Sequence, residues 1–109
     1  MDIFNKHLAV NLVGSFSAYR HCFNVMKNNK LVDGERGVMI AISSIASTQA
    51  NNMGLIPYAA TKGALESMML PMAREMGPLG IRACAVKPCA IDTSIVPIMP
   101  DWIEKRLWE

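Results

Sequence analysis

Tyr58 and Lys62 are the residues of this chain whose types and spacing could carry out proton transfer. They stand four residues apart in the segment Tyr-Ala-Ala-Thr-Lys, and residues at positions i and i+4 of a helix share one face, with Cβ atoms roughly 5–6 Å apart. A tyrosine alone is a poor acid or base at neutral pH, but a neighbouring ammonium favours its phenolate form. The pair could therefore exchange a proton with a substrate, although a packed tyrosine beside a solvated lysine is the commoner outcome of this spacing.

Composition and charge limit the classes of protein to which this chain could belong. A length of 109 residues fits one small domain, and 51% hydrophobic against 18% charged residues predicts a packed core. The net charge of +2 comes from scattered Lys and Arg, which indicates no nucleic-acid partner. There is no apolar run of about 18 residues, so we expect no membrane span. The cysteines and histidines lack the spacing of a metal site, and residues 1–4 lack the pattern of a targeting segment.

Apolar spacing predicts alternating helices and strands. Apolar residues that recur every three or four positions indicate a long first helix, and two short apolar runs indicate strands buried on both faces. Pro57 suits the start of the second helix, and Pro71 should kink it. The predicted helices span residues 2–28, 57–76 and 101–108, the strands 37–43 and 81–87, and the loops 44–56 and 88–100.

A helix between two strands predicts a parallel βαβ unit and an α/β fold. Ligands of parallel α/β sheets bind beyond the carboxyl ends of the strands. Ser43 and Ser44 stand at that end of the first strand, and residues 88–93 follow the second. Tyr58 begins the helix between them. The sequence therefore predicts that three distant segments converge at one rim of the sheet.

These pieces, taken in order, resemble the short-chain dehydrogenase/reductase family. The resemblance covers nearly the whole chain and about half of a family member. It implies part of a Rossmann-like doubly wound parallel sheet, in which residues 1–109 form the catalytic and nicotinamide half and the glycine-rich cofactor half is absent. The matching motifs are Val10-Asn11-Leu12-x-Gly14, Ile42-Ser43-Ser44, Tyr58-x-x-x-Lys62, Gly80-Ile81-Arg82-x-x-Ala85-Val86-x-Pro88 and Ile91-Asp92-Thr93.

The resemblance implies a role for each matching residue. Tyr58 would be the general acid/base, and Lys62 would support it and bind the nicotinamide ribose. Ser44 would hold the substrate carbonyl, with Ser43 as the alternative. Asn11 would anchor a water in a proton relay, unless it is only a polar surface position of its helix. The expected cofactor contacts are Tyr58, Lys62, Pro88, Ile91 and Thr93, and Thr93 could instead be a plain loop residue.

Two further stretches resemble one branch of this family, the mitochondrial type 2 short-chain 3-hydroxyacyl-CoA dehydrogenases, which also act on hydroxysteroids. The stretches are residues 34–38 and residues 70–74 with 78–82. This branch implies interconversion of a secondary alcohol and a ketone in lipid metabolism, with NAD as cofactor and NADP still open. It also implies a mitochondrial location and a homo-oligomer, a dimer or tetramer, without metal.

The chain departs from the family pattern in two ways. Cys89 stands where the family has a glycine that lets the backbone approach the cofactor. The family's glycine-rich phosphate loop and final strand have no counterpart in the sequence. Two hypotheses follow. The chain is part of an NAD(P)-dependent oxidoreductase and inactive by itself, or it is a non-catalytic subunit that associates through its two long helices.

Overall fold

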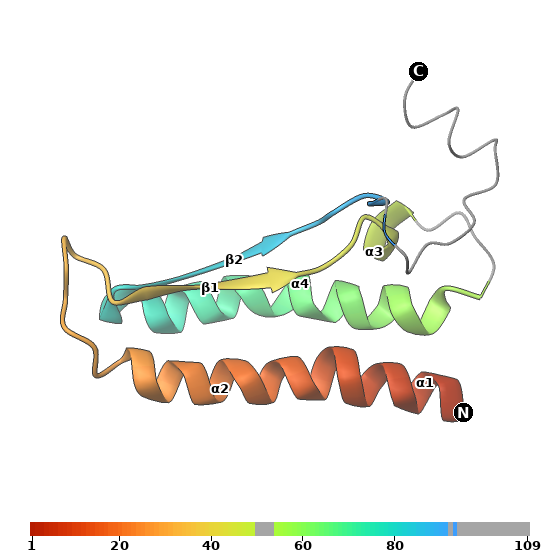
Figure 1. The fold of residues 1–109 in the computed structure, drawn as a ribbon, viewed down its shortest axis with the longest axis horizontal. Helices are drawn as coiled ribbons and strands as arrows, with labels where there is room; N and C mark the ends of the chain where they lie inside the picture. The colour runs from red at the N-terminus through yellow and green to blue at the C-terminus, as the bar shows by residue number, and fades with distance from the viewer. Residues whose placement is uncertain (50–53, 92, 94–109) are drawn as a thin grey trace, which may run out of the picture.

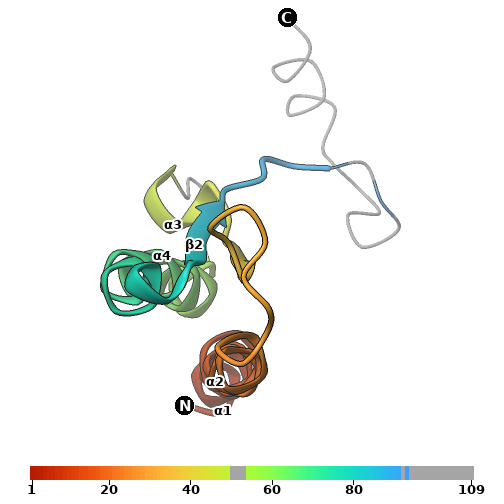
Figure 2. The same cartoon turned by 90° about the vertical axis from the view of Figure 1, so that its left-hand side faces the viewer.

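The computed structural model describes residues 1–49, 54–91 and 93. Both long helices lie on one side of a two-stranded sheet (Figures 1 and 2). This arrangement, helix then strand then helix then strand, confirms the predicted α/β order. The elements are α1 Asp2–His7, the π-helical η1 Leu8–Gly14, α2 Ser15–Met26, β1 Gly37–Ile42, α3 Ala46–Gln49, α4 Ile56–Met76, the 3₁₀ turn η2 Gly77–Leu79 and β2 Ile81–Val86.

The first long helix is continuous from α1 through η1 to α2, as the apolar spacing predicts, and it ends at Met26. Leu12, Tyr19 and Phe23 of its apolar stripe are half-buried and pack against the core. The sequence did not predict the π-helical turns of η1. Such wide turns are rare and occur frequently at functional sites, and Asn11 lies in the middle of this one.

The two strands pair in parallel, which confirms the βαβ unit, and Met39 stands opposite Ala83. Burial on both faces is wrong, because side chains alternate along β1. Met39 and Ala41 are buried, whereas Ile40 and Ile42 are 49% and 55% exposed. The physical reason is that α2 and α4 cover the same face of the sheet, and nothing in the described part of the chain covers the other (Figure 2).

The core lies between α4 and the covered face of the sheet. Buried α4 residues recur every three or four positions, so they form one stripe toward Met39, Ala41 and Ile81. Full burial of one such side chain contributes about 1.5–3 kcal/mol. The helix continues through Pro71 to Met76. The stripe consists of Thr61, Leu65, Met69 and Met72.

The predicted loop after β1 contains a short helix, α3, so that prediction is wrong over Ala46–Gln49. Ser44 explains the helix, because its Oγ accepts a hydrogen bond from the Ala46 N–H at 3.2 Å, as a capping serine does. Residues 88–91 have no regular structure. The predicted helix over residues 101–108 lies outside the described residues. Among the helices that are described, none is long and apolar enough to cross a membrane.

Gly80 ends the helical turn before β2 in a left-handed conformation, with φ of 72°. An added Cβ would lie 2.8 Å from the carbonyl oxygen of Gly34. A side chain in this conformation costs about 1–3 kcal/mol even without a clash. Gly80→Ala should therefore lower the free energy of unfolding by more than about 1 kcal/mol, measured by urea denaturation.

Gly63→Ala is the matched control for Gly80→Ala. Gly63 lies inside α4, and its added Cβ would meet nothing within 4 Å. Alanine in a helix interior is favoured over glycine by roughly 0.5–1 kcal/mol, so this variant should be more stable than the wild type. Equal effects of the two substitutions would contradict the described turn at Gly80.

Candidate active site

The carboxyl ends of β1 and β2 form the rim at which the sequence places a site. The parallel pairing continues past both strands, because the Ser43 N–H donates to the Val86 carbonyl at 2.8 Å and the Ile45 N–H to the Pro88 carbonyl at 3.1 Å. Ser44 therefore lies beside Pro88, which belongs to the neighbouring segment at this rim. Helix α4 begins at Ile56, after the segment that follows α3, which leaves Tyr58 in its first turn.

Tyr58 and Lys62 lie on the same face of α4, as their spacing predicts. The Lys62 Nζ is 5.6 Å from the centroid of the Tyr58 ring, within the range of a cation–π interaction. The same Nζ donates a hydrogen bond of 2.8 Å to the carbonyl oxygen of Ile42, the last residue of β1. His7 of α1 meets the tyrosine ring edge-on, with centroids 6.2 Å apart. Tyr58 is thus held between the first helix and the lysine.

Asn11 connects the π-helical turns to α4, so it is not a simple polar surface position. Its Nδ2 donates to Thr61 Oγ1 at 3.1 Å, and Thr61 Oγ1 donates to the Tyr58 carbonyl at 2.8 Å. Thr61 is only 2% exposed. The sequence analysis did not identify Thr61, although a polar residue on the apolar stripe of α4 could have marked it as a partner for a distant side chain.

The two serines at the end of β1 have different surroundings. Ser43 is 3% exposed, and its hydroxyl donates to Glu66 Oε1 or to the Lys62 carbonyl, which lies 3.0 Å away. Ser44 is half-buried, and its Oγ only accepts a hydrogen bond, from the Ala46 N–H. No acceptor in residues 1–49 or 54–91 takes the Ser44 proton. Within these residues the Ser44 hydroxyl is therefore less engaged than the Ser43 hydroxyl.

The expected cofactor contacts after β2 are less enclosed. Pro88 is half-buried, whereas Cys89, Ile91 and Thr93 are exposed. The backbone bond to Ile45 places Pro88 at the rim, whereas no hydrogen bond in the described part of the chain fixes Ile91 or Thr93 there. Within the described ranges, no three His, Cys, Asp or Glu residues gather as metal ligands would.

Glu66 gathers a set of polar side chains at this rim, and the sequence analysis did not find it. Its Oε1 accepts hydrogen bonds from Ser43 Oγ and Ser47 Oγ. Its Oε2 lies 3.0 Å from the Nζ of Lys87, which follows β2. The Lys87 Nζ also donates to Thr48 Oγ1 at 3.0 Å. One carboxylate thus joins α4 to the ends of both strands and to α3.

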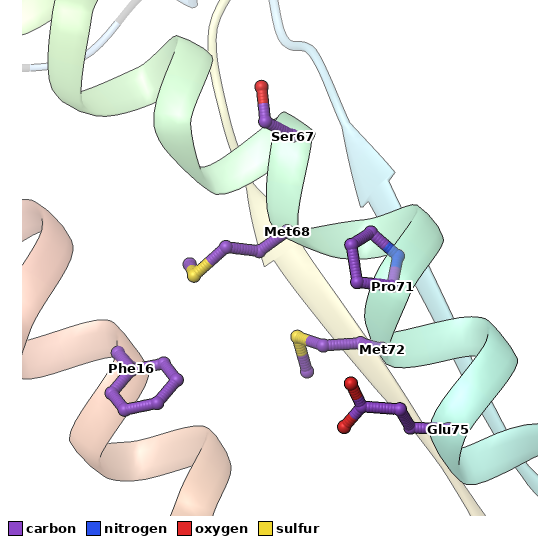
Figure 3. A pocket seen from close by; sticks show the side chains of 6 residues that line it. All are labelled: Phe16, Ser67, Met68, Pro71, Met72 and Glu75. Carbon is purple, nitrogen blue, oxygen red and sulfur yellow. The ribbon is translucent and has the colours of Figure 1, made fainter.

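A pocket of about 280 Å³ lies away from this rim, between α2 and α4 (Figure 3). Phe16 enters it from α2, and the other lining residues belong to the second half of α4. It contains none of the expected catalytic or cofactor-contact residues, so it is not the candidate active site. Its α4 lining residues are Ser67, Met68, Pro71, Met72 and Glu75.

The chain is similar to known proteins of one family. The sequence pattern of the short chain dehydrogenases matches residues 1–103. The chain is 33% identical over 108 residues to 3-hydroxyacyl-CoA dehydrogenase type-2 of Rattus norvegicus, covering 98% of this chain and 41% of the relative. It is also 33% identical over 108 residues to the human (3R)-3-hydroxyacyl-CoA dehydrogenase, covering 99% of this chain and 40% of that protein.

Solved structures show the same relationship. A 3-hydroxyacyl-CoA dehydrogenase type-2 from Mycobacterium avium superposes with a TM-score of 0.82 at 25% identity, over 92% of this chain and 39% of the other. A short chain dehydrogenase from Leptospira borgpetersenii with bound NAD⁺ gives a TM-score of 0.71 at 27% identity, over 84% and 36%.

The chain belongs to the short-chain dehydrogenase family, and its fold is part of the Rossmann-like parallel sheet of these proteins. Its relatives include 3-hydroxyacyl-CoA dehydrogenases of type 2, which is the branch that the sequence resembles. The chain spans about two fifths of the length of the relatives it matches.

Glu66 gives this site a measurable pH dependence. Hydrogen bonds from Ser43 and then Ser47, with a smaller contribution from Lys87, outweigh the opposing effect of burial and lower the pKa of the Glu66 carboxyl to about 2. The pKa is below its ordinary value of 4.5, so the unfolded chain binds more protons as the pH falls through this range. The stabilisation from Glu66 is therefore complete above pH 4.5 and disappears as the pH falls toward about 2.

We predict that Glu66→Gln flattens the acid limb of stability. In urea unfolding from neutral pH down to pH 2, the wild type should lose stability below pH 4.5 more steeply than the variant. Glu75→Gln, at an exposed carboxylate of the same helix, is the control and should keep the wild-type slope. Parallel curves for the wild type and Glu66→Gln would show that Glu66 does not hold these hydrogen bonds.

Proposed function

We propose that this chain is the catalytic half of an NAD(P)-dependent oxidoreductase that interconverts a secondary alcohol and a ketone of the 3-hydroxyacyl-CoA or hydroxysteroid type. The observation that carries the proposal is the position of Lys62, whose ammonium lies over the Tyr58 ring while it donates to the Ile42 carbonyl. The substrate class rests on the names of the relatives. By the same relationship we infer NAD as cofactor, a mitochondrial location and a role in lipid metabolism.

Tyr58 is the general acid/base of this proposal. When an alcohol is oxidised, its hydroxyl proton passes to the phenolate oxygen of Tyr58, and in the reverse direction the phenol returns it to the ketone oxygen. Lys62 stabilises the phenolate by its positive charge. Ser44 donates its hydroxyl proton to the substrate oxygen and so fixes the carbonyl beside Tyr58. A bound nicotinamide would exchange the hydride with the substrate carbon.

The residues around Lys62 fit a nicotinamide nucleotide. An ammonium has three donors, and Lys62 uses one of them on Ile42, which leaves donors for a ribose hydroxyl. Pro88 lies at the same rim, and in this proposal Pro88, Ile91 and Thr93 would contact the nicotinamide. In this proposal Asn11 offers its Oδ1 to a water in the proton relay, because among the described residues its side chain bonds through Nδ2 alone, to Thr61.

A non-catalytic subunit is the second candidate, and the exposed apolar surface of the helices favours it. Val10 and Val13 of the first helix are 72% and 57% exposed, and Leu70 of α4 is 59% exposed. The pocket between α2 and α4 lies on the same pair of helices (Figure 3). This surface would pair with a copy of the chain or a longer relative, and the two candidates differ in whether Tyr58 matters for turnover.

Tyr58→Phe tests the proposal in a hybrid enzyme, in which this chain replaces the matching segment of the rat 3-hydroxyacyl-CoA dehydrogenase type-2. We expect kcat for 3-hydroxybutyryl-CoA oxidation to fall about 10²–10⁴-fold, because general acid/base catalysis contributes that much. The affinity for NADH, measured by fluorescence titration, should not change. Tyr19→Phe, on α2 and away from the rim, is the control. Retained turnover in the Tyr58→Phe hybrid would reject the role of Tyr58 and favour the second candidate.

A further inference from the structure

The Glu66 cluster lies beside the proposed catalytic residues but contains none of them. Glu66 is eight residues after Tyr58 and four after Lys62 in α4, so the three side chains share one face of the helix. The carboxylate is the only group in the described part of the chain that bonds side chains on both sides of Ser44, since Ser43 and Ser47 both donate to its Oε1.

We propose that Glu66, paired with Lys87, is a positioning residue that fixes Ser44 relative to Tyr58; this inference rests on the proposed function. Ser44 is the second of the three residues between the end of β1 and α3, and the residues bonded to Glu66 lie one before it and three after it. A short segment anchored at both ends to α4 holds the residues between the anchors at a set distance from that helix. Tyr58 belongs to the same helix.

The other contacts of the Ser44 segment do not fix it to α4 as firmly. The backbone N–H groups of Ser43 and Ile45 donate to the carbonyls of Val86, the last residue of β2, and of Pro88, at 2.8 and 3.1 Å. These bonds set the segment against the neighbouring strand. Toward α4, the remaining hydrogen bonds are those of the Lys62 carbonyl with the Ser43 hydroxyl at 3.0 Å and of the Lys62 Nζ with the Ile42 carbonyl at 2.8 Å. Both lie before Ser44, so without Glu66 the part of the segment after Ser44 would have no hydrogen bond to α4 among the described residues.

Lys87 completes the arrangement from the other strand. Its Nζ is 3.0 Å from Glu66 Oε2 and 3.0 Å from Thr48 Oγ1, so it bridges the carboxylate and α3. The two charged side chains are 34% and 25% exposed, so solvent screens the pair only in part. Lys87 directs the carboxylate, while the carboxylate supplies the acceptors for the serines.

The alternative is that the cluster stabilises the whole fold without particular effect on Ser44. Hydrogen exchange separates the two, because a positioning role predicts faster exchange in residues 43–49 alone, whereas general stabilisation predicts faster exchange everywhere. The variants for the full 109-residue chain are Glu66→Leu, which removes the acceptors, and Glu66→Gln, which keeps an acceptor and removes the charge.

In hydrogen-exchange mass spectrometry, we expect Glu66→Leu and Lys87→Met to accelerate exchange in residues 43–49 about tenfold or more, with β2 unchanged. Glu66→Gln and Lys87→Arg should lie close to the wild type, because each keeps part of the contact. Glu75→Leu, on the same helix and exposed, is the matched control and should change nothing in this segment. Exchange in residues 43–49 that stays at the wild-type rate, or that rises equally in β2, would overturn the proposal.

Kinetics of the hybrid enzyme give the second test. Glu66→Leu should lower kcat by about 10–100-fold with an unchanged KM for NAD, since a misplacement of about 1 Å can cost that much. Accelerated exchange with an unchanged kcat would overturn the positioning role. Failure of the proposed function would give a different result, namely full turnover of the Tyr58→Phe hybrid. In that case the exchange rate of residues 43–49 still tests whether Glu66 fixes the segment around Ser44.

Discussion

The hydrogen bond from Lys62 Nζ to the Ile42 carbonyl is the contact on which the rest of the site depends. It joins the face of α4 that carries Tyr58 to the end of β1. A hydrogen bond with a charged donor is roughly twice as strong as a neutral one. One turn further along the helix, Glu66 makes the corresponding contact with Ser43. The helix is therefore fixed to the strand at two successive turns, and this sets where Tyr58 and Ser44 can stand.

One face of the sheet is left uncovered by the described residues. Helices cover one face, while Ile40, Ile42 and Val86 are 49%, 55% and 47% exposed on the other (Figure 2). An exposed apolar face, together with outer strand edges that have no partner strand in the described residues, favours association with additional polypeptide. The relatives are more than twice as long, and this chain matches about two fifths of them. The proposed catalytic residues lie at the carboxyl ends of the strands. The surface that would contact additional polypeptide is the exposed face of the same sheet.

Much of this fold can be predicted from the sequence, because the apolar runs and stripes depend on local spacing. The limits of β1, β2 and α4 fall within a residue or two of those expected from Gly37, Pro57 and Gly80. The exposed face of the sheet could not be predicted, since Ile40 and Ile42 are as apolar as buried neighbours. Their exposure depends on what packs above them, which the local pattern does not record.

The candidate site divides in the same way. Tyr58, Lys62 and Ser44 could be selected because they stand in short motifs at fixed spacings. Glu66 could not, because it has an ordinary place in a helix and becomes informative only through partners from distant segments. Thr61 is marked only by being a polar residue on the apolar stripe of α4, and its partner Asn11 becomes known from the structure. The Ser43 and Ser44 alternatives could be separated only by seeing which hydroxyl is already engaged. Tertiary contacts, rather than residue type, decide these positions.

The central claim is that Lys62 lies over the ring of Tyr58 at the end of β1, and lysine side-chain NMR tests it most directly. In a chain labelled with ¹³C at the lysine ε-carbon, the Lys62 resonance, assigned by its loss in Lys62→Arg, should be displaced by the ring current of Tyr58. Tyr58→Leu should move it back, while Lys27, which lies over Phe23, should not change. A Lys62 resonance at the position of a solvated lysine in the wild type would contradict the account.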